Sequence, residues 1–307
     1  MRGNTSIKKM NICILSICLL LITLIGQSSN SFNVAKASGL SYQGVSFYVQ
    51  AHEDDWQLFR GEYAYNDLNA PNTKVVFIYT TAGDAGAENG WWEARERGAI
   101  ASIRKAIAPS PLKMDIIKFN GHPLQRYTIG NSVSYFLRLP DGYIGSGTTA
   151  YNNESLTQLR DSQKSITAVD KSTSYTSWSD FTNTLKAIMD YEKGLVGQSN
   201  PWVNVADFDS SLNPNDHADH KATSDAVASF AHGTYTRGLY VTYDSQNRAP
   251  ILSDPSLTNK KNLYYAYVDE VYSQTVANGY PVDRNIFDNE WAWWGNKSYS
   301  RNVLYNE

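Results

Sequence analysis

A histidine and three acidic residues, His52 to Asp55, directly follow a short apolar stretch, residues 45–50, that is typical of a β-strand. Charged groups at the end of a buried strand are costly unless each has a partner. Two more histidines, His217 and His220, lie in the segment NDHADHK, which follows another expected strand, residues 202–208. Two histidines and one carboxylate form a ligand set that leaves a catalytic Zn²⁺ an open position for water.

Such a site would hydrolyse an amide or an ester. A water bound to the metal has a pKa near ~7 and becomes a usable nucleophile. The reaction also needs a carboxylate that takes a proton from this water and a donor for the oxyanion. One of Asp54 and Asp55 can hold the metal while the other takes the proton from the water. A second histidine can be the donor for the oxyanion. His122 and His232 have no carboxylate at ligand spacing and are expected to be structural or surface histidines.

The elements that must position these groups alternate between strand and helix along the chain. Apolar and β-branched runs predict strands at residues 45–50, 74–79, 114–119, 134–139, 202–208 and 239–243. Helices are expected at residues 91–108, 177–192, 217–232 and 262–278. This alternation predicts an α/β fold with a mostly parallel sheet covered on both faces. Because ligands bind at the carboxyl ends of such strands, the ends after residues 50 and 208 can meet.

The N-terminal segment has the three regions of a secretory signal peptide: basic residues, a 14-residue apolar run (12–25) and a small-x-small site, Ala35-Lys36-Ala37. The apolar run is shorter than the ~20 residues that a membrane-spanning helix needs. We therefore expect residues 1–37 to be removed, a catalytic domain at 38–280 and a C-terminal tail at 281–307 that packs on or extends the domain. The mature chain would have no membrane span and would be secreted, free or associated with the cell wall.

Cleavage would also change the chemistry that the chain offers. Both cysteines, Cys13 and Cys18, lie in the signal, so the mature chain has no disulfide and no thiolate ligand. Four basic residues and no acid are lost, which leaves 23 basic and 30 acidic residues and a formal charge of −7. This acidic balance argues against nucleic acid as a partner, because phosphate binding needs a basic surface. The oligomeric state does not follow from the sequence.

The two segments rich in acids and histidines resemble a known family. AHEDD, residues 51–55, is similar to the AHPDD signature of the PIG-L / LmbE-like N-acetylglucosaminyl deacetylases, and HADH, residues 217–220, matches their H-x-D-H motif. Other segments resemble family motifs in the same order: TTAGDAG (80–86), WWEARERGA (91–99), LRLPDG (137–142) and YVDEVYSQ (267–274). The resemblance covers residues 44–274 and implies a Rossmann-like three-layer fold.

The resemblance also implies a reaction and its residues. The reaction would be hydrolysis of the N-acetyl group of a glucosamine unit, which gives acetate and a free amine. Zn²⁺ would be the cofactor, with Fe²⁺ as the alternative for this ligand set. Asp54 would be the general base, His217 would stabilise the oxyanion, and Asp219 would orient His217. The metal ligands would be His52, Asp55 and His220.

Four residues are candidate substrate contacts. The resemblance implies that Arg95 and Asp141 contact sugar hydroxyls, although Arg95 also fits a solvated helix face and Asp141 a Pro-Asp-Gly turn. Asp84 lies between two glycines and either binds substrate or shapes the turn. Trp92 follows this turn and could stack on a sugar ring, as could Trp91.

Three features leave the substrate open. Glu53 replaces the family's proline and is expected to point to solvent, and Trp56 replaces a glutamate and is expected to form a different wall beside the metal. The WAWW segment, residues 291–294, packs the tail, binds a polymer or closes over the site. An N-acetylated amino sugar or glycoconjugate is the favoured substrate. A zinc hydrolase of a non-sugar N-acyl amide and an inactive carbohydrate-binding protein are the alternatives.

Overall fold

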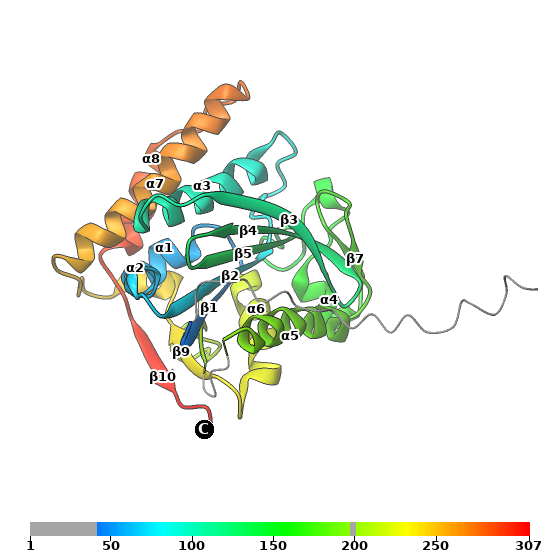
Figure 1. Ribbon diagram of the computed structural model, residues 1–307. Coiled ribbons are helices and arrows are strands. Elements are labelled where there is room, and N and C mark those ends of the chain that lie inside the picture. The colour runs from blue at the N-terminus through cyan, green and yellow to red at the C-terminus, as the bar shows by residue number, and fades with distance from the viewer. Residues whose placement is uncertain (1–41, 197–200) are drawn as a thin grey trace, which may run out of the picture. The chain divides into compact units, whose positions relative to one another are not determined.

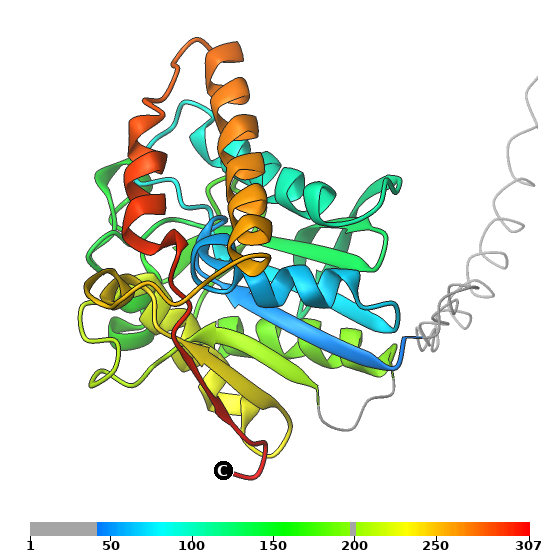
Figure 2. The ribbon, with the colours of Figure 1, turned by 90° about the vertical axis from the view of Figure 1, so that its left-hand side faces the viewer.

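The computed structural model describes residues 42–196 and 201–307, and the expected signal peptide, residues 1–37, lies outside them. The described residues form an eight-stranded sheet in the order β10-β9-β8-β1-β2-β5-β4-β3, with helices on both faces (Figures 1 and 2). A separate two-stranded sheet pairs β6 (Ile166–Thr167) with β7 (Ser174–Tyr175). The predicted three-layer α/β fold with a mostly parallel sheet is confirmed.

Parallel strands form the centre of the large sheet, and antiparallel strands form its edges. The parallel strands are β9 (Thr236–Tyr240), β8 (Trp202–Ala206), β1 (Gly44–Gln50), β2 (Thr73–Thr81) and β5 (Ser132–Leu139). The antiparallel strands are β10 (Ser300–Val303), β4 (His122–Ile129) and β3 (Leu112–Phe119).

Three helices cover each face of the sheet. One layer consists of α2 (Gly61–Asn69), α3 (Trp91–Ala106) and α7 (Ser256–Ala277). The other consists of α4 (Leu156–Ser162), α5 (Trp178–Gly194) and α6 (Ala218–Ala231). Shorter pieces are α1 (Asp55–Phe59), α8 (Asn285–Glu290), the 3₁₀ turns η1 (Thr149–Tyr151) and η2 (Tyr243–Asn247), and the π-helical turn η3 (Trp291–Gly295). No helix of the described residues is long and apolar enough to span a bilayer.

The core is divided by the sheet into two apolar layers. Along β2, Val76 and Ile78 pack toward α5 and α6, whereas Val75, Phe77 and Tyr79 pack toward α3 and α7. Successive side chains of a strand point to opposite faces, so a continuous apolar run fits a strand that is covered twice. β1 and β8 are central strands whose side chains pack on both faces in the same way. This packing fixes the positions of their carboxyl ends.

Several boundaries differ from the predicted ones. β9 begins at Thr236 rather than 239, and α7 begins at Ser256 rather than 262. β4 was not expected, because Pro123 lies in it and proline is depleted in strands. The signal for it was Asn120-Gly121, whose φ angles of +50° and +88° make a tight hairpin between β3 and β4. Residues 281–307 supply α8, η3 and β10, so this segment extends the sheet.

Candidate metal centre

The carboxyl ends of β1 and β8 lie side by side, because the two strands pair in parallel with Ser46 opposite Trp202. β2 lies on the other side of β1, so this edge is the switch point at which α/β sheets bind ligands. His52 follows β1, and the segment containing His217 and His220 follows β8. The structure therefore brings together the two segments that the sequence predicted to meet.

Three buried side chains converge on one point at this edge. The Nδ1 atom of His52 lies 3.1 Å from Nε2 of His220 and 3.5 Å from Oδ1 of Asp55. The same Oδ1 atom lies 3.0 Å from Nε2 of His220. All three residues are at most 5% exposed. These are the three ligands that the resemblance implies, and each contributes one donor atom to the cluster.

The spacing of these atoms fits a divalent cation. With metal–ligand bonds of 2.0 to 2.2 Å, the ligand atoms of a tetrahedral zinc lie about 3.3 Å apart. Three donors at this spacing leave a fourth position open. Burial alone would lower the pKa of His220, but the carboxylates of Asp55 and Asp216 raise it to about 10. The environment thus favours positive charge at this point, as a cation site requires.

A second layer of hydrogen bonds fixes the ligands. Asp216 accepts a hydrogen bond from Nδ1 of His220 at 2.6 Å, which directs Nε2 to the cluster. Asp216 is itself held by Asn213 and Thr242. The Oδ2 atom of Asp55 accepts bonds from the backbone N–H groups of residues 51 and 52. Partners of this kind orient metal ligands and raise their affinity for the metal.

Asp54 lies beside the ligands and is held by Arg95 from α3. The Arg95 guanidinium donates to Oδ1 of Asp54 at 2.7 Å and to Oε2 of Glu53 at 3.0 Å. Two donors of Arg95 are thus bonded to carboxylates of the protein. Its predicted contact with sugar hydroxyls stays a prediction. The expectation that Glu53 points to solvent is wrong. It is fully buried, and burial raises its pKa to about 8 although Arg95 opposes the shift.

His217 caps the N-terminus of α6 and has a defined tautomer. Its Nδ1 atom accepts a hydrogen bond from the backbone N–H of Asp219 at 3.2 Å. A neutral imidazole that accepts at one nitrogen carries its proton on the other, so Nε2 of His217 is a donor. Burial, together with the neighbouring His52, lowers the pKa of His217 to about 4. His217 is therefore a neutral hydrogen-bond donor at neutral pH.

Asp219 and Asp141 lie on the other side of His52. The Nε2 atom of His52 is buried without a hydrogen bond within the described residues, 3.6 Å from Asp219 and 3.7 Å from Asp141. Asp219 was expected to orient His217 through its carboxylate. Its backbone N–H makes that bond, and its carboxylate accepts from the backbone N–H of Gly142 at 2.7 Å. Asp141 lies 3.8 Å from Nε2 of His217.

The other two candidate substrate contacts lie further from the cluster. Asp84 is fully buried and accepts bonds from the backbone N–H groups of Asp141, at 2.6 Å, and Gly86. It therefore positions Asp141. Trp92 lies against the guanidinium of Arg138, 4.8 Å from its ring centroid. Trp91, in contrast, lines a hollow of about 330 Å³ that also contains Asp84, Arg95 and Glu290.

Trp56 does not form a wall of the site, contrary to expectation. It is fully buried in the core beside Phe77, and its indole N–H donates to Tyr79 at 2.9 Å. The WAWW segment packs the C-terminal region on the rest of the chain. Trp294 stacks on Tyr243 at 4.8 Å, and Tyr243 lies edge-on to His220 at 5.2 Å.

Two other histidines have the structural or surface positions expected of them, and one residue was missed. His122 bonds Thr173 and Asp180, whereas His232 is exposed at the end of α6. The sequence analysis did not identify Asp216 as the partner of a metal ligand. The signal was its place four residues before His220: Asp216 directly precedes His217, the N-cap of α6, and its carboxylate reaches Nδ1 of His220 from there.

Comparison with known proteins finds similarity of structure only. No protein-family model and no curated protein matches the chain. The matched solved structures include a zinc inhibited form of teicoplanin deacetylase Orf2, with 12% identity and a TM-score of 0.43 over 80% of this chain and 89% of that one. N,N′-diacetylchitobiose deacetylase from Pyrococcus horikoshii shares 13% identity, with a TM-score of 0.42 over 97% and 95%.

A third matched structure has a different chemistry. It is a 4-carboxy-2-hydroxymuconate hydratase from Pseudomonas putida, with 11% identity and a TM-score of 0.41 over 80% of this chain and 83% of that one. At these identities and TM-scores the similarities assign no activity to the chain.

Proposed function

We propose that this protein is a secreted zinc-dependent hydrolase that removes the N-acetyl group from a substrate containing N-acetylglucosamine. The observation that carries the proposal is the convergence of His52, Asp55 and His220 within 3.5 Å of one another, with Asp54 and His217 beside them. The predicted signal peptide supports secretion, and the AHEDD and HADH segments support the substrate class.

A zinc ion held by these three ligands would lower the pKa of a water molecule and polarise the amide carbonyl. Asp54 takes the proton of the attacking water. Arg95 fixes its Oδ1 atom at 2.7 Å, whereas Oδ2 has a weaker contact, from the Tyr267 hydroxyl at 3.5 Å, so Oδ2 is the atom that accepts the proton. Since Arg95 also bonds the buried Glu53, the guanidinium is fixed from both sides and holds the base in place.

His217 stabilises the negative charge that develops on the carbonyl oxygen. Its Nε2–H group is the free donor, because Nδ1 already accepts the backbone N–H of Asp219. A fixed donor of this kind, in a site that excludes water, accounts for a large part of the rate in acyl transfer. The carbon–nitrogen bond then breaks, and the proton held by Asp54 passes to the leaving nitrogen, which gives acetate and a free amine.

One observation favours a second candidate, the hydrolysis of a substrate with a larger apolar group. The hollow beside Arg95 is lined mainly by apolar side chains, including Val282, Ile286 and Phe287. A single acetyl group would fill little of its volume of about 330 Å³. An apolar acyl chain or aglycone would fill more of it, so the alternative N-acyl amide substrates belong in the same test.

The test is a screen for acid and amine release with purified protein and added Zn²⁺. Chitin oligomers, peptidoglycan fragments and N-acetylglucosamine conjugates would be compared with N-acyl amides that lack a sugar. We expect acetate from at least one amino sugar and none in the presence of a chelator. Turnover of only the non-sugar amides would favour the second candidate, and no product from any substrate would refute both. Elemental analysis of protein purified without added metal would distinguish Zn²⁺ from Fe²⁺.

A further inference from the structure

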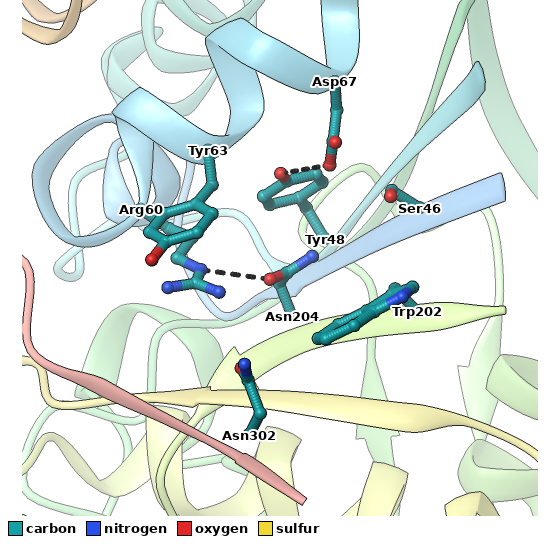
Figure 3. A pocket seen from close by; sticks show the side chains of 8 residues that line it. All are labelled: Ser46, Tyr48, Arg60, Tyr63, Asp67, Trp202, Asn204 and Asn302. Carbon is teal, nitrogen blue, oxygen red and sulfur yellow. Dashed lines mark hydrogen bonds between the residues drawn. The ribbon is translucent and has the colours of Figure 1, made fainter. Parts of the chain in front are cut away.

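A second cavity lies on the face of the sheet that carries α2, away from the metal centre. We call it the β1–β8 pocket. Its volume is about 210 Å³, and its walls come from two strands of the centre, the edge strand β10, and α2 with the residue before it (Figure 3). The residues that matter for its chemistry are Tyr48, Arg60, Tyr63, Trp202, Asn204 and Asn302. Tyr48 precedes His52 by four residues, which is about 13 Å along an extended strand.

The charged groups of the pocket already have partners. The Arg60 side chain donates to Asn204 at 3.0 Å and to Ser300 at 2.6 Å, and its guanidinium lies 3.4 Å from the centroid of the Tyr63 ring. On the opposite side, Tyr48 donates to Asp67 at 2.7 Å. One positive and one negative side chain thus balance each other, and their hydrogen bonds hold the walls in place (Figure 3).

Other polar groups of the pocket have no such partner. Within the described residues, the indole N–H of Trp202, the side-chain amide of Asn302 and the hydroxyl of Tyr63 make no hydrogen bond. Trp202 is half-buried, and Tyr63 is 45% exposed. The pocket therefore presents aromatic rings together with free hydrogen-bonding groups. The Trp202 indole donates, whereas the Tyr63 hydroxyl and the Asn302 amide can both donate and accept.

We infer that the β1–β8 pocket binds one neutral pyranose ring of a glycan. The apolar C–H face of such a ring packs on an aromatic side chain, and its hydroxyl groups both donate and accept hydrogen bonds. The volume is below the roughly 300 to 1,000 Å³ of sites for larger ligands, so one ring fits and a longer segment does not. This site is separate from the proposed catalytic function.

The charges of the pocket favour a neutral sugar over an anionic ligand. Nε and Nη1 of Arg60 are already bonded, and the Asp67 carboxylate lines the same pocket, so a phosphate would meet at most one unbonded guanidinium nitrogen and an opposing negative charge. The chain also has more acidic than basic residues, which opposes the binding of nucleotides. A nucleotide is therefore the outcome that would contradict the inference.

The pocket and the metal centre are joined by one short helix. α1 begins with the metal-site residue Asp55, and Arg60 directly follows its last residue, Phe59. A glycan held by one ring in the pocket would raise the local concentration of the rest of the chain near the catalytic edge. The effect would appear in KM for oligosaccharides and not in kcat for a small substrate.

The direct test is calorimetric titration of the metal-loaded protein with glucose, N-acetylglucosamine and β-1,4-linked oligosaccharides. Trp202→Ala should weaken binding about tenfold, because an aromatic anchor carries much of the energy of a small interface. Asn302→Ala, on the exposed edge strand, gives a second variant if Trp202→Ala does not fold. Trp293→Ala is the matched control, since this indole is 42% exposed and does not line the pocket.

The outcomes separate this inference from the proposed reaction. Binding that is retained in Asp54→Asn but lost in Trp202→Ala or Asn302→Ala supports the pocket, whether or not acetate is released. Equal affinity of wild type and both pocket variants would refute it, as would the absence of saturable binding at millimolar sugar. Tighter binding of adenosine monophosphate than of every sugar, lost in Trp202→Ala, would also overturn it.

Discussion

The same two strands carry two very different sites. At the carboxyl ends of β1 and β8, His52 and His220 are buried among four carboxylates, and nearly every polar atom has a charged neighbour. In the β1–β8 pocket, lined by earlier residues of the same strands, the charges are balanced and neutral polar groups are free. The first arrangement suits a cation and proton transfer, and the second suits recognition of a neutral ligand.

The difference shows where the chain accepts the cost of buried charge. A buried ion is expensive unless it is paired and hydrogen-bonded. At the metal centre, Asp216, Arg95 and backbone N–H groups provide those partners. Away from it, the described part of the chain also buries charged side chains, and some, such as Lys74 with Glu192, form ion pairs, whereas Lys260 has only the more distant Glu62. Substituting one charged residue at a time therefore tests whether the metal centre and the pocket side differ in this way. The first substitution is of the proposed general base.

Asp54→Asn should have the largest effect. The amide cannot accept a proton, so we expect deacetylation to fall by about 10² to 10⁴-fold. Metal content should not change, because the ligand atoms belong to His52, Asp55 and His220. Acetate release and elemental analysis of the same preparation would measure both. Full activity with intact metal would mean that Asp54 is not the base, and loss of metal would place it among the ligands.

Arg95→Met should be destabilising, and most of all above pH 8, because burial raises the pKa of Glu53 to about 8 and the carboxylate formed above that pH would lack its buried cation, at a cost of about 3 to 5 kcal/mol in the free energy of unfolding. Urea denaturation would measure the loss. Adding Glu53→Gln should restore part of it at pH 9 and little at pH 6, because only the ionised carboxylate is left without a cation. Arg284→Met is the control, since its pair with Asp269 is exposed and worth about 0 to 1 kcal/mol. Equal losses for the two arginines would remove the distinction between the centre and the surface.

The sequence predicted the parts of this centre that depend on strand order. His52 and His220 lie after strands with clear apolar patterns, and parallel neighbours bring such ends together. The sequence could not predict that the side chains of Glu53 and Trp56 point into the protein. Their burial depends on Arg95 from α3 and on Phe77 and Tyr79 from β2, which approach from distant parts of the chain.

The β1–β8 pocket was beyond prediction for a related reason. Its residues come from β1, α2, β8 and β10, and no local pattern joins Tyr48 to Asn302. β10 itself has only four residues and was expected to be part of a tail. Clusters that combine short segments far apart in the sequence become visible only when the sheet order is known.

Asp216→Asn should weaken metal binding about 10- to 100-fold, because Asp216 fixes the tautomer of His220 from the second shell of contacts. Competition with a chelator would give the affinity. Asp225→Asn is the control on α6, the helix that carries His220, because the Asp225 carboxylate bonds Arg160 and no metal ligand. An unchanged affinity in Asp216→Asn would show that His220 is oriented by packing against Tyr243 and Phe59 alone.

Lys260→Met should have an effect on stability that depends on pH. Lys260 is fully buried against Gly61, which follows the pocket residue Arg60. Burial lowers its pKa from 10.5 to about 8. Between these values the unfolded chain binds more protons than the folded one, so Lys260 makes the stability rise with pH in this window and destabilises the fold below it.

Lys260→Met should therefore be more stable than wild type at pH 7, and the difference should shrink as the pH rises toward 10.5. Denaturation of the two proteins across this range would measure it, with the exposed neighbour Lys261→Met as the control. A difference that is constant with pH would mean that the bond from Nζ to the carbonyl of Lys297 and the nearby Glu62 compensate the charge. The pocket side of β1 would then tolerate a buried cation as well as the metal centre does.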